Sequence, residues 1–388
     1  MQYPPSKLPG TGTSIFTVMS ALAQAHGAVN LSQGFPDFSC DARLSGLAAA
    51  AMQAGHHQYA PMPGLPALRG QVAARVLARY GADFDPGTEI TITSGATEAL
   101  LCACAAFVHP GDEVLIFEPA YDAYAPLIRL QGGIPVPIQL TFPAYRIPWD
   151  AVHAAVGPRT RALLLNSPHN PTGALLAPAD LAMLRSLAAQ HPQLLFFSDE
   201  VYEYLTFDGR PHLSLCADAV LRPRSVVISS FGKSLHITGW KVGYCLAPPA
   251  LTDEIRRVHQ FTVFSTATPF QHAIAAYLER YPEELDTLGS WYEQKRNRFL
   301  ELIGGSGLEP LPCEGAYFQL LRYDGLSSLP DTELVQRLTV EAGVACIPVS
   351  AFYAEAPEHR IIRCCFAKRD ETLAEGAARL RAWFRRNH

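Results

Sequence analysis

Between about residue 90 and residue 250, short apolar runs alternate with longer helix-like segments. This alternation is typical of a sheet whose strands are mostly parallel and covered by helices on both faces. Six strands are expected at residues 89–95, 112–119, 133–140, 161–168, 194–200 and 225–232. A seventh, at 241–248, is expected at an edge or antiparallel to its neighbour. The predicted fold class is α/β, with a mixed, mostly parallel seven-stranded sheet between helices.

The sequence pattern differs in the remainder of the chain. From about residue 275, long charged helical segments surround two strand-like stretches, "AYFQLL" and "HRIIRCCF", which indicates a smaller α+β domain. The first forty residues are rich in turn-forming residues, as in "NLSQGFPDF", and are not expected to form a core element. We expect an N-terminal arm over residues 1–40 that packs with the small domain and lines the cleft. A large domain is expected over 41–275, and the small domain over 276–388.

Composition and charge narrow the classes of partner. The 388 residues are 48% hydrophobic and 17% charged, with a formal charge of −5 and no block of like charges. This pattern offers no electrostatic footprint for nucleic acid and favours a small-molecule partner. No apolar run reaches membrane-spanning length and no signal peptide is visible, so we expect a cytoplasmic protein without membrane contact. The nine cysteines are expected to be reduced and buried, and no metal site is predicted.

The stretch Gly232-Lys233-Ser234 matches the last three positions of a nucleotide phosphate loop. Such a loop also needs a glycine five residues before Gly232, so that backbone N–H groups can wrap the phosphates. That position holds Val227, and the residues before Lys233 look like the end of a strand. A phosphate-loop ATPase is therefore disfavoured, and Lys233 needs another role.

Polar residues follow several of the predicted strands at the point where each strand ends. Ligands of parallel sheets bind outside the carboxyl ends of the strands, where the loops converge. After the first strand, Gly95, Ala96 and Thr97 open a helix whose free N–H groups are suited to a phosphate. The later strands are followed by side chains of differing chemistry, namely Asn170, Asp199, Tyr202, Ser230 and Lys233.

This set of side chains fits the needs of pyridoxal 5′-phosphate. The aldehyde of the cofactor requires an amine, for which Lys233 is suited. Its pyridine nitrogen requires a carboxylate, Asp199, and its ring hydroxyl requires hydrogen-bonding partners, Tyr202 and Asn170. The phosphate requires donors and positive charge, which residues 95–97, Ser230 and Lys241 would provide. We therefore predict pyridoxal phosphate as the cofactor and assign the catalytic roles to Lys233, Asp199 and Tyr202.

With these residues in place, the chain resembles the class I, or fold-type I, pyridoxal-phosphate aminotransferases. The resemblance spans nearly the whole chain, and its motifs are specific in combination and order. Within the family the chain is most similar to the bacterial methionine and the kynurenine/glutamine-type aminotransferases. The motifs are "NLSQGFPDF", "QYAPMPGLPALR", "EPAYDAY", "NSPHNPTG", "SDEVYEYLTFDG", "SSFGKSLHITGWKVGY", "LPCEGAYF" and "IIRCCFAK".

The resemblance implies roles for further residues. Tyr121 is expected to stack on the cofactor ring, and Arg363 to bind the α-carboxylate of the substrate with its planar fork. Gly34 and Asn170 are expected to assist at that carboxylate. Tyr59 resembles the tyrosine that reaches the phosphate of the neighbouring subunit, which implies a homodimer with shared active sites. Lys241 stands where many relatives have an arginine, and no loss of function is expected from this difference.

The expected reaction is a ping-pong transfer of an amino group from an amino acid to a 2-oxo acid, with Lys233 carrying the proton. Two stretches expected as loops, "TSIFTVM" and "GFPDF", would wall the pocket with Ile15, Phe16, Phe35 and Phe38. An apolar pocket binds methionine or aromatic side chains by burial of area. Methionine is therefore the first expected substrate, followed by phenylalanine, tyrosine, kynurenine and glutamine.

Two alternatives on the same fold stay open. The site could catalyse β-elimination from cystathionine or another cysteine S-conjugate, which would release pyruvate and ammonia without an oxo-acid acceptor. The chain could also be a non-catalytic sensor that binds pyridoxal phosphate, as in the effector domains of some transcription regulators. The sequence shows neither a helix-turn-helix module nor a basic stripe, which disfavours the sensor.

Overall fold

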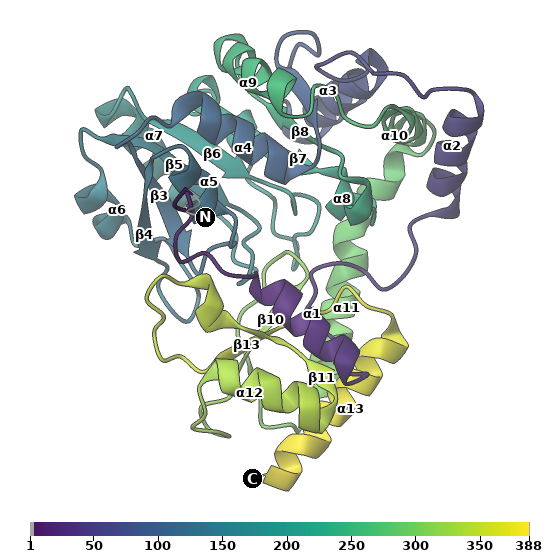
Figure 1. Ribbon diagram of the computed structural model, residues 1–388, viewed down its shortest axis with the longest axis vertical. Coiled ribbons are helices and arrows are strands. Elements are labelled where there is room, and N and C mark those ends of the chain that lie inside the picture. The colour runs from purple at the N-terminus through teal and green to yellow at the C-terminus, as the bar shows by residue number, and fades with distance from the viewer. Residues whose placement is uncertain (1–3, 388) are drawn as a thin grey trace.

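The computed structural model describes residues 4–387, and its largest sheet has seven strands. This sheet lies in the upper part of the molecule in Figure 1. The order of the strands across the sheet is β2-β8-β7-β6-β5-β3-β4. All neighbours pair in parallel except β8, which is antiparallel to both β2 and β7. The bounds are β2 (Ile90–Thr93), β3 (Glu113–Glu118), β4 (Ile134–Gln139), β5 (Thr160–Asn166), β6 (Leu195–Asp199), β7 (Ser225–Ser230) and β8 (Gly243–Leu246).

This sheet confirms the predicted α/β class, with one refinement. The stretch expected at 241–248 runs antiparallel, but it lies inside the sheet between β2 and β7 rather than at an edge. Its four residues are all buried, as expected of a strand with a neighbour on each side. The edge strand β4 is partly exposed and contains Pro135 and Pro137, which cannot donate ladder hydrogen bonds and are therefore tolerated where a strand has one neighbour.

Helices cover both faces of the sheet, because alternate residues of each strand are apolar on opposite sides. Val114 and Ile116 of β3 pack into one apolar cluster with residues of α4, α5 and α9, whereas Leu115 and Phe117 pack into another with α6 and α7. The bounds are α2 (Ala42–Gln53), α3 (Pro66–Tyr80), α4 (Ala96–Phe107), α5 (Tyr124–Leu130), α6 (Trp149–Ala155), α7 (Pro178–Gln190), α8 (Phe231–Ser234), α9 (Pro249–Thr262) and α10 (Thr268–Arg280).

The C-terminal part contains an antiparallel sheet in the order β12-β13-β10-β9, and it lies below the large sheet in Figure 1. The helical stretch expected after residue 280 is divided into a short 3-10 turn (Pro282–Leu285) and α11. The bounds are α11 (Leu288–Ile303), β9 (Glu309–Pro310), β10 (Phe318–Arg322), α12 (Asp331–Arg337), β11 (Val344–Ala345), β12 (Ile347–Pro348), β13 (Ile361–Cys365) and α13 (Asp370–Asn387).

The N-terminal arm joins this C-terminal part. Strand β1 (Val29–Asn30) pairs in parallel with β11, and helix α1 (Ile15–Ala25) precedes it. The sequence interpretation of residues 13–19 as a loop was wrong, because Ser14 caps a helix by accepting a hydrogen bond from the N–H of Thr17. The division of the chain at residues 40 and 275 stays a prediction. No helix within residues 4–387 combines the length and apolar character needed to cross a membrane.

Candidate active site

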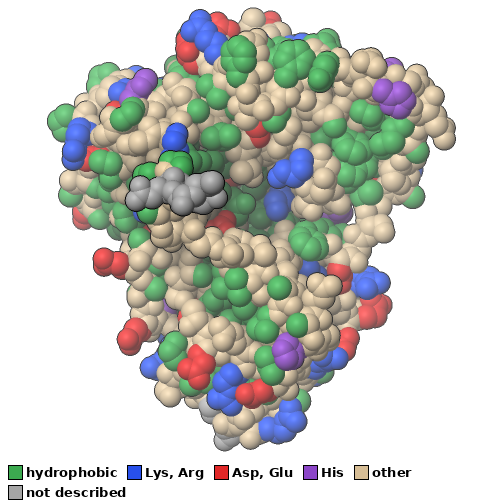
Figure 2. Space-filling model, in the orientation of Figure 1, with side chains coloured by type: hydrophobic (Ala, Val, Ile, Leu, Met, Phe, Trp, Pro, Cys, Tyr) green, Lys and Arg blue, Asp and Glu red, His purple; other side chains and the backbone are tan. Residues whose placement is uncertain are grey.

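A cavity of about 270 Å³ lies where β2, β5, β6 and β7 end, facing the C-terminal part. Figure 2 shows a hollow at the centre of one face, between the upper and lower parts of the molecule, with basic side chains beside it. All of the predicted site residues except Tyr59, Ile15 and Phe38 line this cavity. These residues are Phe16, Gly34, Phe35, Gly95, Ala96, Thr97, Tyr121, Asn170, Asp199, Tyr202, Ser230, Lys233, Lys241 and Arg363.

The start of α4 forms a cradle for an anion. Gly95 precedes the helix with a φ of 77°, a conformation that glycine adopts without strain. A Cβ added to Gly95 would lie 3.2 Å from Lys241 Nζ, so the ammonium stands directly beside the helix N-terminus. Free N–H groups, the positive end of the helix dipole and a lysine together suit a phosphate.

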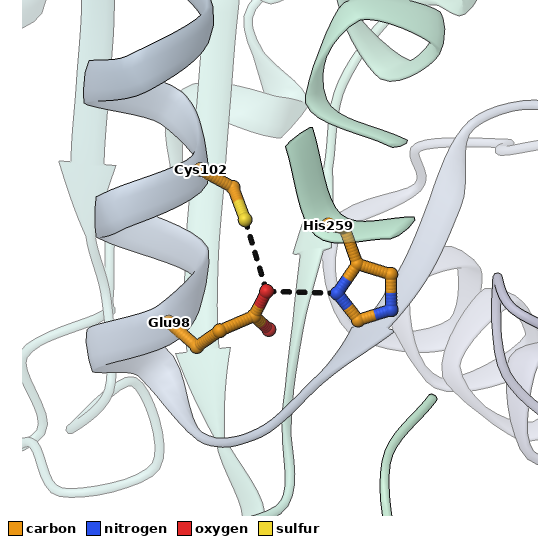
Figure 3. A group of neighbouring side chains, drawn as sticks. All are labelled: Glu98, Cys102 and His259. Carbon is orange, nitrogen blue, oxygen red and sulfur yellow. Dashed lines mark hydrogen bonds and ion pairs between the residues drawn. The ribbon is translucent and has the colours of Figure 1, made fainter. Parts of the chain in front are cut away.

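The far side of this helix start is held by a buried cluster of Glu98, Cys102 and His259 (Figure 3). The Oε1 atom of Glu98 accepts a hydrogen bond from the Cys102 thiol at 2.9 Å and lies 2.8 Å from His259 Nδ1. The other carboxyl oxygen, Oε2, accepts from the N–H of Ser94 at 3.0 Å, and His259 Nε2 lies 3.0 Å from the carbonyl oxygen of Met62. These residue types also bind metals, but here their polar atoms pair with one another. The cluster ties α4 to α9 and to the loop before α3.

Lys233 reaches the cavity from the short helix α8, which directly follows β7. Ser230 caps this helix by accepting from the N–H of Gly232 at 3.2 Å. Lys233 Nζ donates to the hydroxyl of Tyr317 at 3.0 Å and to the carbonyl oxygen of Gly34 at 3.3 Å. Removal of the amine from water lowers its pKa to about 8. About one tenth of the amine is therefore neutral, and nucleophilic, at pH 7.

Asp199 ends β6 as a buried carboxylate. It accepts hydrogen bonds from the hydroxyl of Tyr124 at 2.7 Å and from the N–H of Val201 at 3.3 Å. Burial nevertheless raises its pKa to about 6, because no cation pairs with it directly in the described part of the chain. A protonated ring nitrogen would provide such a cation, so the environment of Asp199 fits a pyridinium.

Arg363 is fully buried on β13 and has no carboxylate partner within the described residues. Its guanidinium donates to Asn170 Oδ1 at 2.8 Å and to the carbonyl oxygen of Ser32 at 2.9 Å, and Nε has no hydrogen-bond partner. A buried cation without an anion is costly unless a ligand supplies one. The residue is therefore suited to a substrate carboxylate.

Aromatic side chains complete the walls. Tyr121 lines the cavity and packs edge-on against Tyr124, with the ring centroids 5.6 Å apart. Phe16 and Phe35 line the cavity as predicted, but Ile15 and Phe38 do not. Ile15 packs on the apolar core from the first turn of α1, and the Phe38 ring lies 5.2 Å from that of Trp291.

Some site residues were not predicted. Tyr124 and Asn166 line the cavity and contact Asp199, and Tyr317 contacts Lys233. Tyr317 belongs to the stretch "LPCEGAYF", which was noted only as a family motif. Tyr59 lies outside the cavity of its own chain and is 82% exposed.

Comparisons with known proteins identify the class to which this fold and site belong, which is that of the aminotransferases. The family model "Aminotransferase class I and II" matches residues 27–380, and the chain belongs to this family. Methionine aminotransferase of Escherichia coli is 48% identical over 378 residues, covering 97% of this chain and 98% of that protein.

Three further comparisons define the range of similarity. The solved structure of a methionine aminotransferase from Escherichia coli superposes with a TM-score of 0.96 at 48% identity, covering 98% of this chain and all of that one. That of N-succinyldiaminopimelate aminotransferase from Mycobacterium tuberculosis gives 0.94 at 38% identity, again over 98% and 100%. Kynurenine–oxoglutarate transaminase 1 of Mus musculus is 32% identical, over 97% of each chain.

The lowered pKa of Lys233 predicts how its reactivity depends on pH. Only the neutral amine is acylated, so in cofactor-free protein the labelling of Lys233 should rise with pH, with a midpoint near 8. Brief treatment with acetic anhydride over a pH series, followed by mass spectrometry of the Lys233 peptide, gives this midpoint. An ordinary exposed lysine titrates at about 10.4, and a midpoint there would contradict the burial effect.

Proposed function

We propose that this aminotransferase uses pyridoxal 5′-phosphate to move the amino group of methionine, or of another large apolar or aromatic amino acid, to a 2-oxo acid. The observation that carries the proposal is one cavity that holds an amine with a pKa of about 8, a buried carboxylate and an arginine without a carboxylate partner. Each of these groups matches one requirement of cofactor or substrate.

The residues present fit the cofactor. The start of α4, Ser230 and Lys241 would hold the phosphate, Asp199 the ring nitrogen, and Tyr202 and Asn170 the ring hydroxyl. Tyr121 would stack on the ring. Bound pyridoxal phosphate supplies an aldehyde carbon that receives the amino group and a ring that draws electrons from the substrate Cα.

The protein supplies binding, orientation and proton transfer. Arg363 binds the α-carboxylate through N–H groups of its planar guanidinium, which fixes the direction of the Cα–H bond. Lys233 Nζ, when neutral, accepts the Cα proton and holds it as an ammonium. Its burial favours this role, because a lysine with an ordinary pKa would be almost entirely protonated at neutral pH.

The pocket favours an apolar substrate side chain. Arg363 lies under the rings of Phe318 and Phe16, with its guanidinium carbon 4.0 and 5.0 Å from the ring centroids. Among the described residues that line the cavity, the other basic side chains are Lys233 and Lys241, which already have roles. A second substrate carboxylate would therefore lack a cation. The similarity to methionine aminotransferase and to kynurenine transaminases supports the same preference.

A homodimer with shared active sites is supported by an exposed apolar patch, which consists of Tyr59, Phe261, Val263 and Phe264. Phe261 is 85% exposed, and the rings of Tyr59 and Phe264 pack edge-on with their centroids 5.2 Å apart. Large aromatic side chains clustered on a surface mark an interaction site. A second copy of the chain is the proposed partner, with Tyr59 reaching its phosphate site.

The cofactor assignment is tested by replacing Lys233. Purified wild-type protein treated with borohydride should retain the cofactor covalently, and adding methionine beforehand should change the visible absorbance and prevent retention. Lys233→Ala should retain none, while Lys7→Ala, which alters an exposed lysine, should behave as wild type. Equal covalent retention in Lys233→Ala and wild type would refute the assignment.

The substrate preference is tested by comparing kcat/KM for methionine and aspartate with a common 2-oxo acid. Burying an apolar side chain contributes about 1.5–3 kcal/mol, so methionine should be preferred by at least about tenfold. A preference for aspartate would contradict the apolar pocket. Pyruvate and ammonia formed from cystathionine without an oxo acid would instead identify a β-lyase, and an absence of turnover with bound cofactor a sensor.

The dimer is tested by placing a charge in the apolar patch. Phe261→Glu would bury an unpaired carboxylate in the interface, so sedimentation velocity should show a larger monomer fraction than in wild type. Val220→Glu, at an exposed position outside the patch, is the matched control and should remain dimeric. A wild-type protein that sediments as a monomer at all concentrations would reject the shared site.

A further inference from the structure

Tyr317 contacts the reactive amine but belongs to none of the predicted functional sets. It is fully buried immediately before β10, and it follows Ala316, whose φ of 61° turns the chain into the strand. Its ring packs edge-on against Tyr202 and Phe318, with centroids 4.9 and 4.8 Å away. Its hydroxyl oxygen lies 2.5 Å from the carbonyl oxygen of Gly34 and 3.0 Å from Lys233 Nζ.

The direction of these hydrogen bonds follows from chemistry. A carbonyl oxygen only accepts, so the single hydroxyl hydrogen of Tyr317 is donated to Gly34. Burial raises the pKa of Tyr317 far above its ordinary value, so this hydrogen stays on the phenol. The lone pairs of the phenol oxygen remain for Lys233, which donates an N–H to them. The tyrosine thus acts toward the lysine as an acceptor.

The Gly34 carbonyl, which accepts the Tyr317 hydrogen, is itself firmly placed. Gly34 lies so close to Phe318 that an added Cβ would be 2.9 Å from its ring, so a larger residue would displace the carbonyl. On either side of Gly34, the buried Lys368 donates to the carbonyl oxygens of Gln33 and Phe35, at 3.3 and 2.7 Å. The Gly34 carbonyl therefore has a fixed direction, and it fixes the orientation of the Tyr317 hydroxyl.

We propose that Tyr317 is a positioning residue for Lys233. It accepts a hydrogen bond from the lysine amine while its own hydrogen is anchored on Gly34, and so holds Nζ in place during proton transfer. This rests on the proposed function, in which Lys233 carries the proton. A lysine has a flexible four-carbon stem, and orienting it beforehand removes part of the entropy cost of reaction. The acceptor also favours the ammonium form that exists once Lys233 has taken the proton.

A second buried tyrosine provides a matched control. The ring of Tyr292 lies 5.7 Å from that of Tyr317 and is equally buried. Its hydroxyl has no hydrogen-bond partner within the described residues. Tyr292→Phe therefore removes a neighbouring hydroxyl that contacts no functional group, whereas Tyr317→Phe removes the one that contacts Lys233.

The first measurement uses cofactor-free protein. Loss of a hydrogen bond accepted from the ammonium destabilises the charged form, so the acetic anhydride labelling midpoint of Lys233 should fall by about one pH unit in Tyr317→Phe. Tyr292→Phe should keep the wild-type midpoint. The labelling midpoint depends on neither substrate nor cofactor, so this measurement is separate from the test of the proposed function.

The second measurement uses the cofactor-loaded enzyme with methionine. In Tyr317→Phe, kcat should fall about tenfold with KM changed by less than about twofold, because positioning of the proton carrier acts on the chemical step. Deuterium at the methionine Cα should slow this variant more than it slows wild type. Tyr292→Phe should match wild type in both respects.

Several outcomes would overturn the proposal. Equal midpoints and equal kcat in the two variants would show that the Tyr317 hydroxyl does nothing for Lys233. Failure of Tyr317→Phe alone to fold, seen by thermal unfolding, would make the hydroxyl a structural anchor of Gly34 instead. A wild-type enzyme that transfers no amino group would refute the proposed function, yet the labelling midpoints would still decide whether Tyr317 controls the amine.

Discussion

The enclosure of two cations in one cavity is the constraint on which the rest of the site depends. Arg363 is fully buried and Lys233 is partly buried, and neither receives a carboxylate as a direct partner within the described residues. Such an arrangement costs stability, and neutral oxygens offset part of it, from Gly34, Tyr317, Asn170 and Ser32. The part that stays uncompensated at Arg363 suits the cavity to the carboxylate of the proposed substrate.

The backbone helps to make this arrangement possible because helices and strands carry several of the site residues. Asp199 and Ser230 end buried strands, Arg363 lies within a strand, and Gly95 opens a helix. The start of that helix is in turn held by the cluster around Glu98. Sites built on strands and helices are more precise than sites on free loops, which suits a reaction that depends on the direction of one C–H bond.

Much of the fold and site could be predicted from the sequence, because buried parallel strands are continuous apolar runs and their polar ends mark the ligand side. Asp199 and Lys233 were found in this way. Residues that act through tertiary contacts could not be found from the polar ends of apolar runs. Tyr124 contacts Asp199 from another element, and Tyr317 contacts Lys233 across 84 residues of sequence. Neither contact leaves a recognisable pattern in the sequence. Helix α1 was not predicted because the turn-forming residues around it indicated a loop, and Ser14 was not recognised as a helix cap.

Under the proposed function, the group that binds the substrate carboxylate and the groups that act on the cofactor and the proton come from two different sheets. Arg363 projects from the antiparallel C-terminal sheet, whereas Asp199 and Lys233 follow strands of the seven-stranded sheet. The distance between Arg363 and Lys233 is therefore set by the way in which two separate sheets pack against each other. Substitutions between those sheets, far from the reacting atoms, would alter catalysis by changing this distance while the catalytic side chains stay the same.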